Sequence, residues 1–282
     1  MEDDEVTSNQ IGDRSAAASD DLGRRCDVLR SLHVPGTPLL LPNAWDVASA
    51  GAVVAAGFAA VATTSGGVAA ALGYEDHEHA PANEMLAAAG RICRSVDVPV
   101  TVDAEAGYGM EPADLVAALQ RIGAAGCNLE DTDHATGEQR DPMQHARWLR
   151  AVRAAASDAG YALVINARID VFLFALLGGA GAGTQLGLVT AALERAHAYV
   201  ETGVDCVFPI ALWEEDALRA FMADAPGPVN ILRTPRAPAL PDLAELGVAR
   251  ISYGSLLHHD AMDQFAGVLR SIAAEATGHE GT

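Results

Sequence analysis

The sequence predicts an α/β protein built as an eight-stranded (β/α)8 barrel. Eight short, apolar, β-prone runs alternate with longer helical segments, a spacing that suits eight βα units in about 250 residues. The runs are apolar throughout, as parallel strands covered by helices on the outside tend to be. The first run is not followed by a glycine-rich phosphate turn, which disfavours the competing architecture, a doubly wound open sheet.

The expected strands recur at regular intervals along the chain, and segments rich in Ala and Leu separate them. The expected strands are Pro38–Leu41, Ala59–Thr64, Val98–Asp103, Cys127–Glu130, Leu163–Arg168, Cys206–Phe208, Val229–Leu232 and Arg250–Tyr253. Helices are expected at Leu22–Leu32, before the first strand, and at Pro112–Ala125, Pro142–Ala159, Leu188–Thr202 and Asp242–Leu246. Two of these helices begin on proline, whose fixed φ suits the first helical turn.

A faint internal repeat marks the points where helices pass into strands. Gly57, Gly126, Gly203 and Gly247 each precede an apolar residue at such a point. Glycine takes the left-handed conformation that ends a helix without a steric penalty. We therefore expect all four glycines to terminate helices.

The length of 282 residues fits one large domain or two small ones, and 50% apolar residues allow a sizeable core. We expect residues 1–21 to form a disordered acidic tail and residues 22–282 to form one barrel domain. No targeting signal is recognisable at the N-terminus, and the run Phe172–Leu188 is too short and too rich in Gly to span a membrane. The four cysteines lack CxxC spacing, so we expect buried free thiols and a cytoplasmic location.

The charge composition excludes several kinds of chemistry. All 18 cationic side chains are arginines, against 38 Asp and Glu, and the net charge is -20. Without lysine the chain can form neither a Schiff base nor a lysine-bearing phosphate loop. The acidic balance also argues against nucleic acid as a partner, because phosphate backbones need a basic surface.

Polar side chains gather where the expected strands end, and in a barrel these carboxyl ends form the functional face. Asn43 and Asp46 follow the first strand, and Thr63 to Gly67 follow the second. Asp103 and Glu105 end the third strand, and Glu130 and Asp131 end the fourth. Converging carboxylates with no His/Cys cluster favour Mg²⁺ or Mn²⁺. The alternative is that Asp131 caps a helix and that the other acids lie in solvated loops.

Arg168 directly follows the fifth strand, where it can pair with the acidic residues or bind a substrate carboxylate. Six histidines lie in the expected loops or helices, and we expect each to be a surface residue and not a ligand. They are His77, His79, His134, His145, His258 and His259. In a barrel without lysine, an oxyanion on a 2-oxo acid must be stabilised by a metal ion, arginine or backbone N–H groups. The sequence therefore indicates metal-assisted enolate chemistry.

Several ordered motifs resemble the isocitrate lyase/phosphoenolpyruvate mutase superfamily over roughly residues 39–254. Thr-Ser-Gly-Gly at 64–67, followed by Leu-Gly-Tyr-Glu-Asp at 72–76, is similar to the family's Ser-Gly turn and its metal-site aspartate. Asp-Ala-Glu-Ala-Gly-Tyr-Gly at 103–109 is similar to the family's D-A-D-x-G-Y-G metal motif. Leu-Glu-Asp at 129–131 and Asn-Ala-Arg at 166–168 match its glutamate and its substrate-binding arginine.

The resemblance implies a (β/α)8 barrel with an N-terminal helix and a swapped C-terminal helix, assembled as a homotetramer or a dimer. It implies Mg²⁺, with Mn²⁺ as an alternative, held directly by Asp103 and mainly through water by the other acids. The implied water-mediated metal residues are Asp76, Glu105 and Glu130; the implied substrate-binding residues are Thr64, Ser65, Gly66, Asn43, Trp45 and Arg168. Arg168 would also neutralise the charge that develops in the reaction.

Two departures from the family pattern concern the reaction itself. Glu105 replaces the second aspartate of the metal motif and is longer by one methylene. The family's lysine- and cysteine-bearing loop is replaced by residues 133–140, Asp-His-Ala-Thr-Gly-Glu-Gln-Arg. His134, Glu138 or Arg140 could donate a proton or bind substrate; we assign His134 and Glu138, with Arg168, as the catalytic candidates. The alternative is that the loop is an ordinary solvated lid.

These features predict a Mg²⁺-dependent lyase that cleaves a C–C bond in a 2-hydroxy or 2-oxo carboxylic acid. Two alternatives stay open. One is phosphorus–carbon chemistry, as a phosphoenolpyruvate mutase or phosphonopyruvate hydrolase. The other is a barrel that binds a 2-oxo acid without converting it. The expected partner is a small carboxylate, with neither nucleic acid nor membrane.

Overall fold

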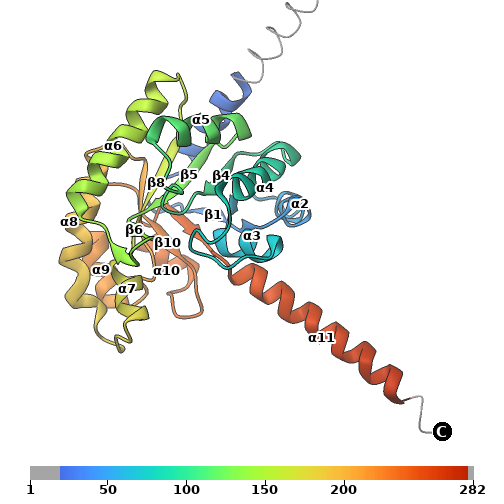
Figure 1. The fold of residues 1–282 in the computed structure, drawn as a ribbon. Coiled ribbons are helices and arrows are strands. Elements are labelled where there is room, and N and C mark those ends of the chain that lie inside the picture. The colour runs from blue at the N-terminus through green and yellow to red at the C-terminus, as the bar shows by residue number, and fades with distance from the viewer. Residues whose placement is uncertain (1–19, 279–282) are drawn as a thin grey trace, which may run out of the picture.

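Parallel strands follow one another in sequence order around a closed barrel in the computed structural model, which describes residues 20–278 (Figure 1). The barrel strands are β1 (Leu39–Leu41), β2 (Asn43–Ala44), β3 (Val61–Thr63), β4 (Val100–Asp103), β5 (Gly126–Glu130), β8 (Val164–Ile169), β9 (Cys206–Pro209), β10 (Asn230–Leu232) and β11 (Arg250–Ser252). β1 and β2 are the two parts of the first strand, separated by Pro42. The eight expected strands and the barrel fold are confirmed.

The barrel closes through this split first strand. β2 pairs with β3 and begins the ladder that runs through β4, β5 and β8 to β9. A parallel bridge between Val207 and Val229 links β9 to the start of β10. β10 pairs with β11, and β11 pairs with β1. Pro42 has no N–H to contribute to a ladder, and at this residue the first strand changes from one neighbour to the other.

Helices follow most of the strands and cover the outside of the barrel (Figure 1). They are α2 (Val47–Ala55), α3 (Ser65–Leu72), α4 (Ala82–Ser95), α5 (Pro112–Ile122), α6 (Pro142–Asp158), α7 (Val171–Leu177), α8 (Val189–Val200), α9 (Glu215–Asp224) and α10 (Leu240–Glu245), with a 3₁₀ turn at Gln185–Leu188. Residues 20–31 are also helical. Proline opens α5 and α6 as expected, and the Asp141 carboxylate caps α6 by accepting from the backbone N–H of Gln144 at 2.9 Å.

Three of the four glycine predictions are confirmed. Gly57, Gly203 and Gly247 have φ between +85° and +88°, the left-handed conformation that ends a helix. The prediction for Gly126 is wrong, because α5 ends at Gly123 (φ +80°) and Gly126 lies inside β5. A Cβ on Gly126 would come within 2.8 Å of the Val164 carbonyl oxygen, so glycine here permits close approach of β5 and β8.

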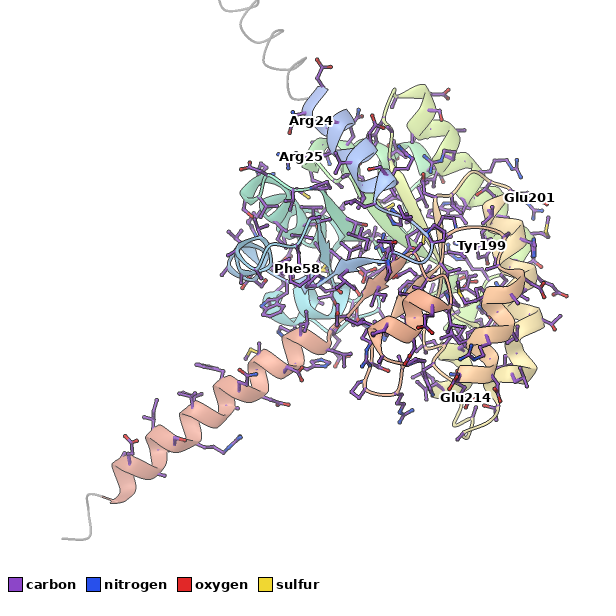
Figure 2. The ribbon with its side chains drawn as sticks, turned by 180° about the vertical axis from the view of Figure 1, so that it is seen from behind. Arg24, Arg25, Phe58, Tyr199, Glu201 and Glu214 are labelled. Carbon is purple, nitrogen blue, oxygen red and sulfur yellow. The ribbon has the colours of Figure 1, made fainter. Side chains whose placement is uncertain are left out.

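The N-terminal helix closes the end of the barrel opposite the carboxyl ends of the strands. Arg25, labelled in Figure 2, donates to the Val96 carbonyl at 2.9 Å. Arg30 on the same helix and Arg153 on α6 both bind the Asp205 carboxylate, at 2.7 and 2.5 Å. The expected acidic tail lies outside the described residues up to position 19, and residues 20 and 21 are helical.

An arginine that forms no ion pair with a carboxylate of the described residues crosses the barrel interior. Arg250 on β11 is fully buried, and its Nη2 donates to the Asn128 side chain on β5 at 3.0 Å. Asn166 on β8 donates to the same oxygen at 2.9 Å. The Nε and Nη1 atoms of Arg250 have no partner within residues 20–278. All four cysteines are also buried, as free thiols.

The buried His33 gives the fold a defined response to acid. Burial, followed by the nearby Arg250 charge, lowers the pKa of His33 to about 4, from about 6.5 in an unfolded chain. As the pH falls from about 6.5 to about 4, the unfolded chain binds a proton that the folded chain does not. We therefore expect His33 to reduce the free energy of unfolding across this window, by about 1.4 kcal/mol per unit of pKa difference.

Urea unfolding at several pH values measures this contribution. His33→Gln is expected to show a shallower loss of stability between pH 6.5 and 4 than the wild-type chain. His197→Gln, an exposed residue on α8, serves as the matched control and is expected to follow the wild type. Parallel pH curves for wild type and His33→Gln would contradict the prediction.

The C-terminal helix α11 (Leu256–Gly278) extends away from the barrel as a single long rod (Figure 1). Figure 2 shows its side chains projecting with no other element beside most of its length. Phe265, Val268, Leu269 and Ile272 are 49–57% exposed and their spacing places them in one stripe. No helix of the described residues is long and apolar enough to cross a membrane.

Candidate active site

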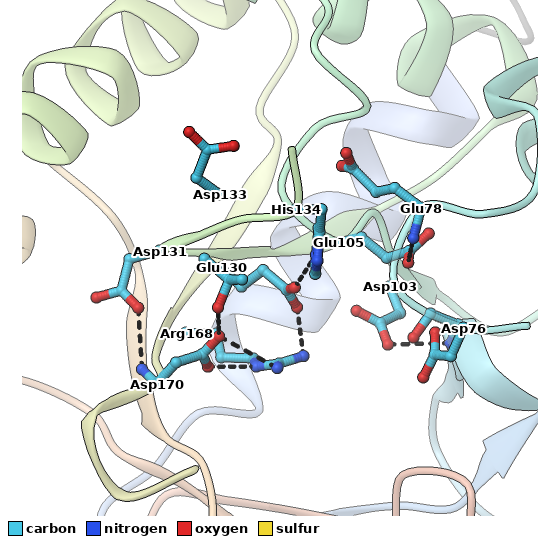
Figure 3. A network of polar contacts seen from close by, with 12 residues as sticks. Asp76, Glu78, Asp103, Glu105, Glu130, Asp131, Asp133, His134, Arg168 and Asp170 are labelled. Atoms are coloured by element: carbon cyan, nitrogen blue, oxygen red, sulfur yellow. Dashed lines mark hydrogen bonds and ion pairs between the residues drawn. The ribbon is translucent and has the colours of Figure 1, made fainter. Parts of the chain in front are cut away.

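Asp103 lies at the centre of an acidic cluster at the carboxyl ends of the strands (Figure 3). It is the last residue of β4, and its backbone N–H binds the Thr63 hydroxyl at 2.8 Å. Its Oδ2 accepts from the backbone N–H of Ser65, at the start of α3, at 3.0 Å. The Thr63 contact positions the Asp103 backbone and the Ser65 contact positions its carboxylate, whose Oδ1 has no hydrogen-bond partner among the described residues.

Three buried carboxylate oxygens in this cluster lack a hydrogen-bond partner among the described residues: Oδ1 of Asp76, Oδ1 of Asp103 and Oε2 of Glu105. Buried carboxylate oxygens are costly unless a donor or a cation satisfies them. Oxygen ligands of this kind suit Mg²⁺ or Mn²⁺. No group of three His, Cys, Asp or Glu side chains between residues 20 and 278 is arranged to hold a metal directly. The donor set therefore fits a cation that reaches some of these acids through water.

Glu105 binds a neighbouring loop as well as facing the cluster. Its Oε1 accepts from the backbone N–H of Glu78 at 2.7 Å, and Glu78 Oε1 accepts from the backbone N–H of Tyr108 at 2.6 Å. Burial, with the charges of Asp103, Asp76 and Glu130, raises the pKa of Glu105 to about 8. Glu105 and Glu78 thus link the loop after β4 to the loop between α3 and α4. Glu78 is a site residue that the sequence motifs did not indicate.

Glu130, His134 and Arg168 form a buried network beside the acidic cluster (Figure 3). The two oxygens of Glu130 bind His134 Nε2, at 2.5 Å, and Arg168 Nη1. Arg168 Nε also donates to Asp170 at 2.6 Å. Although burial opposes protonation, the Glu130 hydrogen bond and the surrounding carboxylates raise the pKa of His134. His134 is thus disposed to carry a proton beside the cluster.

The loop that departs from the family pattern forms a small hairpin of β6 (Thr132–Asp133) and β7 (Glu138–Gln139). Of the two catalytic candidates in this loop, the structure brings only His134 into the buried network. Glu138 is exposed on β7. Arg140 lies 5.9 Å from the Trp148 ring centroid.

Asp131 anchors the base of this loop. One of its oxygens accepts from the Asp170 backbone N–H at 2.9 Å, and the other accepts from Tyr199 at 2.7 Å and Arg195 at 2.9 Å. Asp131 is fully buried. Asp131 therefore fixes the hairpin to α8. It neither caps a helix nor lies in a solvated loop, which were the two alternatives for the strand-end carboxylates.

The residues expected to bind substrate surround the start of α3. The Thr64 hydroxyl hydrogen-bonds Ser255 at 2.8 Å, a contact with the far end of the chain. A Cβ on Gly66 would lie 2.6 Å from the Ser255 oxygen and 2.8 Å from Asp76 Oδ2, so any other residue there would displace one of these side chains. Ser255 is a further residue at this position that the sequence motifs did not indicate.

Asn43 and Trp45 have structural partners. The Asn43 amide donates to the Thr63 carbonyl at 2.7 Å and accepts from the backbone N–H groups of Tyr253 and Gly254. Its side chain therefore links β2 to the ends of β3 and β11, where the barrel closes. Trp45 packs edge-on against His258, with ring centroids 5.1 Å apart. The structure places both residues at the same end of the barrel as the acidic cluster.

Comparison with known proteins gives consistent matches. The family model described as phosphoenolpyruvate phosphomutase matches residues 29–273. The chain is 30% identical over 241 residues to a probable 2-methylisocitrate lyase of Corynebacterium glutamicum, covering 83% of this chain and 76% of that one. It is 30% identical over 253 residues to a phosphoenolpyruvate phosphomutase of Streptomyces hygroscopicus, covering 84% and 75%. A putative phosphonomutase structure from Burkholderia cenocepacia has a TM-score of 0.81 at 43% identity, covering 87% and 99%.

Proposed function

Because this chain belongs to the phosphoenolpyruvate phosphomutase family, we propose that it is a Mg²⁺-dependent lyase that cleaves a C–C bond in a 2-hydroxy or 2-oxo carboxylic acid. The family includes both lyases and mutases, as the names of the relatives state. The observation that carries the proposal is the pairing of His134 with Glu130 beside three carboxylate oxygens that have no hydrogen-bond partner within residues 20–278. A carbanion released by C–C cleavage needs a proton, and His134 is a donor beside the cluster.

In the proposed mechanism Asp103 would hold the metal directly, and Asp76 and Glu105 would act through bound water. When bound, Mg²⁺ would supply Lewis-acid stabilisation of negative charge on the substrate oxygen. Gly66 and Gly67, in the first turn of α3, provide a positive helix end for the substrate carboxylate. Arg168 places a buried positive charge next to the developing oxyanion.

His134 would hold the proton at Nε2, in the hydrogen bond to Glu130, and pass it to the carbanion. Glu130 orients the imidazole and is itself held by Arg168. Phosphoryl transfer would instead require cationic groups around the moving phosphoryl group. Besides His134, the only cationic side chain in the 133–140 loop is Arg140, which packs at Trp148. This difference favours carbon–carbon cleavage.

A panel of acids tests the reaction. 2-Methylisocitrate, 2,3-dimethylmalate and oxaloacetate are incubated with the protein and Mg²⁺, and released 2-oxo acids or oxalate are quantified by mass spectrometry. We expect turnover of at least one acid of this class, loss of turnover with EDTA, and recovery with excess Mg²⁺. Phosphonopyruvate is expected to give an unchanged phosphorus NMR spectrum. Conversion of phosphonopyruvate, with no acid of the panel cleaved, would reject the lyase in favour of phosphorus–carbon chemistry.

We also propose that the chain forms a homo-oligomer in which the apolar stripe of α11 packs against another copy. A half-exposed stripe on an extended helix is unfavourable in water and is covered by association. Phe265→Asp is expected to shift the mass measured by light scattering towards the monomer. Gln264→Asp introduces the same charge beside the stripe and is expected to leave the mass unchanged. A wild-type chain that is monomeric at micromolar concentration would reject the proposal.

A further inference from the structure

A cleft lies beside the hairpin loop, where Arg140 ends that loop. Its volume is about 330 Å³, and it separates the segment between β4 and α5 from the start of α6. Its lining includes Ala106, Met110, Arg140, Gln144, His145 and Trp148. It shares no lining residue with the acidic cluster or with the network of Glu130, His134 and Arg168.

His145 is the most unusual residue of this cleft. It is fully buried, so the expectation of a surface histidine is wrong, yet it lines the cleft and neither ring nitrogen has a partner within the described part of the chain. Its ring stacks on Trp148, with centroids 5.6 Å apart, and meets the edge of Tyr199 at 5.1 Å. Burial lowers the pKa of His145 to about 3, so the ring is neutral at physiological pH. A neutral imidazole offers one donor and one acceptor.

Arg140 brings a positive charge to the same cleft. Its guanidinium lies 5.9 Å from the centroid of the Trp148 ring and forms no ion pair in residues 20–278. Its backbone is fixed, because its N–H donates to the Asp131 carbonyl at 2.8 Å and its own carbonyl accepts from Arg195 at 2.9 Å. Among the described residues, the cleft therefore contains an arginine side chain without an ion pair, next to unsatisfied imidazole nitrogens and apolar walls.

We propose that this cleft is a binding site for a small monocarboxylate with a compact apolar body. The carboxylate would pair with Arg140, a polar atom of the ligand would bind the His145 ring, and the body would lie against Met110 and Ala106. A monoanion matches the charges better than a phosphate dianion, because the cleft has one cation and is also lined by Glu111. Arg140 ends the loop that carries His134, so the ligand would contact that loop at its C-terminal end.

Titration calorimetry with benzoate, in EDTA and without added metal, tests this site independently of any reaction. We expect saturable binding of one benzoate per chain. Benzamide, which lacks the charge, is expected to bind at least about tenfold more weakly because it cannot form a charge-assisted hydrogen bond with Arg140. Acetate, which keeps the charge but lacks the apolar body, is expected to bind at least about tenfold more weakly because it buries less apolar surface. No saturable binding of benzoate would overturn the proposal.

Variants locate the binding. Arg140→Gln is expected to weaken benzoate binding by about tenfold or more, whereas Arg150→Gln, an exposed arginine further along α6, should match the wild type. His145→Phe keeps the ring but removes both nitrogens and should also weaken binding; if this buried substitution unfolds the chain, Arg140→Gln decides alone. Equal affinity of Arg140→Gln and Arg150→Gln would overturn the proposal.

A competition experiment separates the cleft from the acidic cluster. Oxalate with Mg²⁺ is added at saturating concentration before the benzoate titration. We expect the affinity for benzoate to stay unchanged, because the two sites share no residues. Displacement of benzoate by oxalate would place it in the acidic cluster and reject the second site, while leaving the proposed lyase activity untouched.

Discussion

Asp103→Ala is expected to abolish Mg²⁺-dependent turnover, with a fall in kcat/KM of about 10³-fold or more. Asp103 is the proposed direct ligand, and removing it takes away the carboxylate that the backbone N–H of Ser65 positions. Without the ion, stabilisation of the developing oxyanion by several kcal/mol is lost. The effect should exceed that of changing an acid that acts through water, for which losses of about 10–100-fold are typical.

Mg²⁺ titration calorimetry together with steady-state kinetics measures this effect. Asp103→Ala should lose both metal binding and activity. Asp114→Asn, on the exposed first turn of α5, removes a charge of the same sign and should change neither. Wild-type Mg²⁺ affinity in Asp103→Ala would show that the metal binds elsewhere. If Asp103→Ala changed only the affinity for a 2-oxo acid, in a chain without turnover, a barrel that binds without catalysis would be the better description.

Arg168→Met is expected to lower both stability and activity. The Arg168 guanidinium is buried and binds Glu130 and Asp170, whose carboxylates are themselves 2% and 0% exposed. Methionine retains much of the side-chain volume but leaves two buried carboxylates without their cation. Breaking a buried ion pair by removing one partner typically costs about 3–5 kcal/mol. The charge beside the developing oxyanion is lost as well.

Two further variants separate the structural effect from the chemical one. Arg168→Lys keeps a cation but loses the planar fork, so it should recover part of the stability and little of the activity. Adding Glu130→Gln to Arg168→Met should recover stability without activity, because one uncompensated charge is removed. Urea unfolding and kcat/KM measure the two quantities. A fully stable Arg168→Met chain with normal activity would contradict both roles.

The strand positions were predictable because they depend on local properties of the chain. A short apolar run followed by helix-forming residues defines a βα unit, and parallel closure then brings the strand ends to one face. This is how Asp103 and Glu130 could be assigned to one site from their positions alone. Proline at the start of α5 and α6 is local in the same sense.

Contacts between loops could not be predicted in this way. Glu78 reaches Glu105 and Tyr108 because two loops take left-handed residues at His77, Glu78, Glu105 and Tyr108. Ser255 reaches Thr64 across 191 positions of sequence. Gly126 resembled a helix terminus, but its role depends on how closely β8 approaches. Each of these depends on packing distances that a single sequence does not specify.

The burial of every cysteine has a practical consequence. Cys26, Cys93, Cys127 and Cys206 lie in the N-terminal helix, α4, β5 and β9, and burial raises the pKa of each thiol to about 12. Since a thiol reacts as its thiolate, a disulfide reagent should label the native chain only when a segment opens. The four sulfur atoms are therefore built-in reporters of local unfolding, and peptide mapping of the label would show which sector of the barrel opens first.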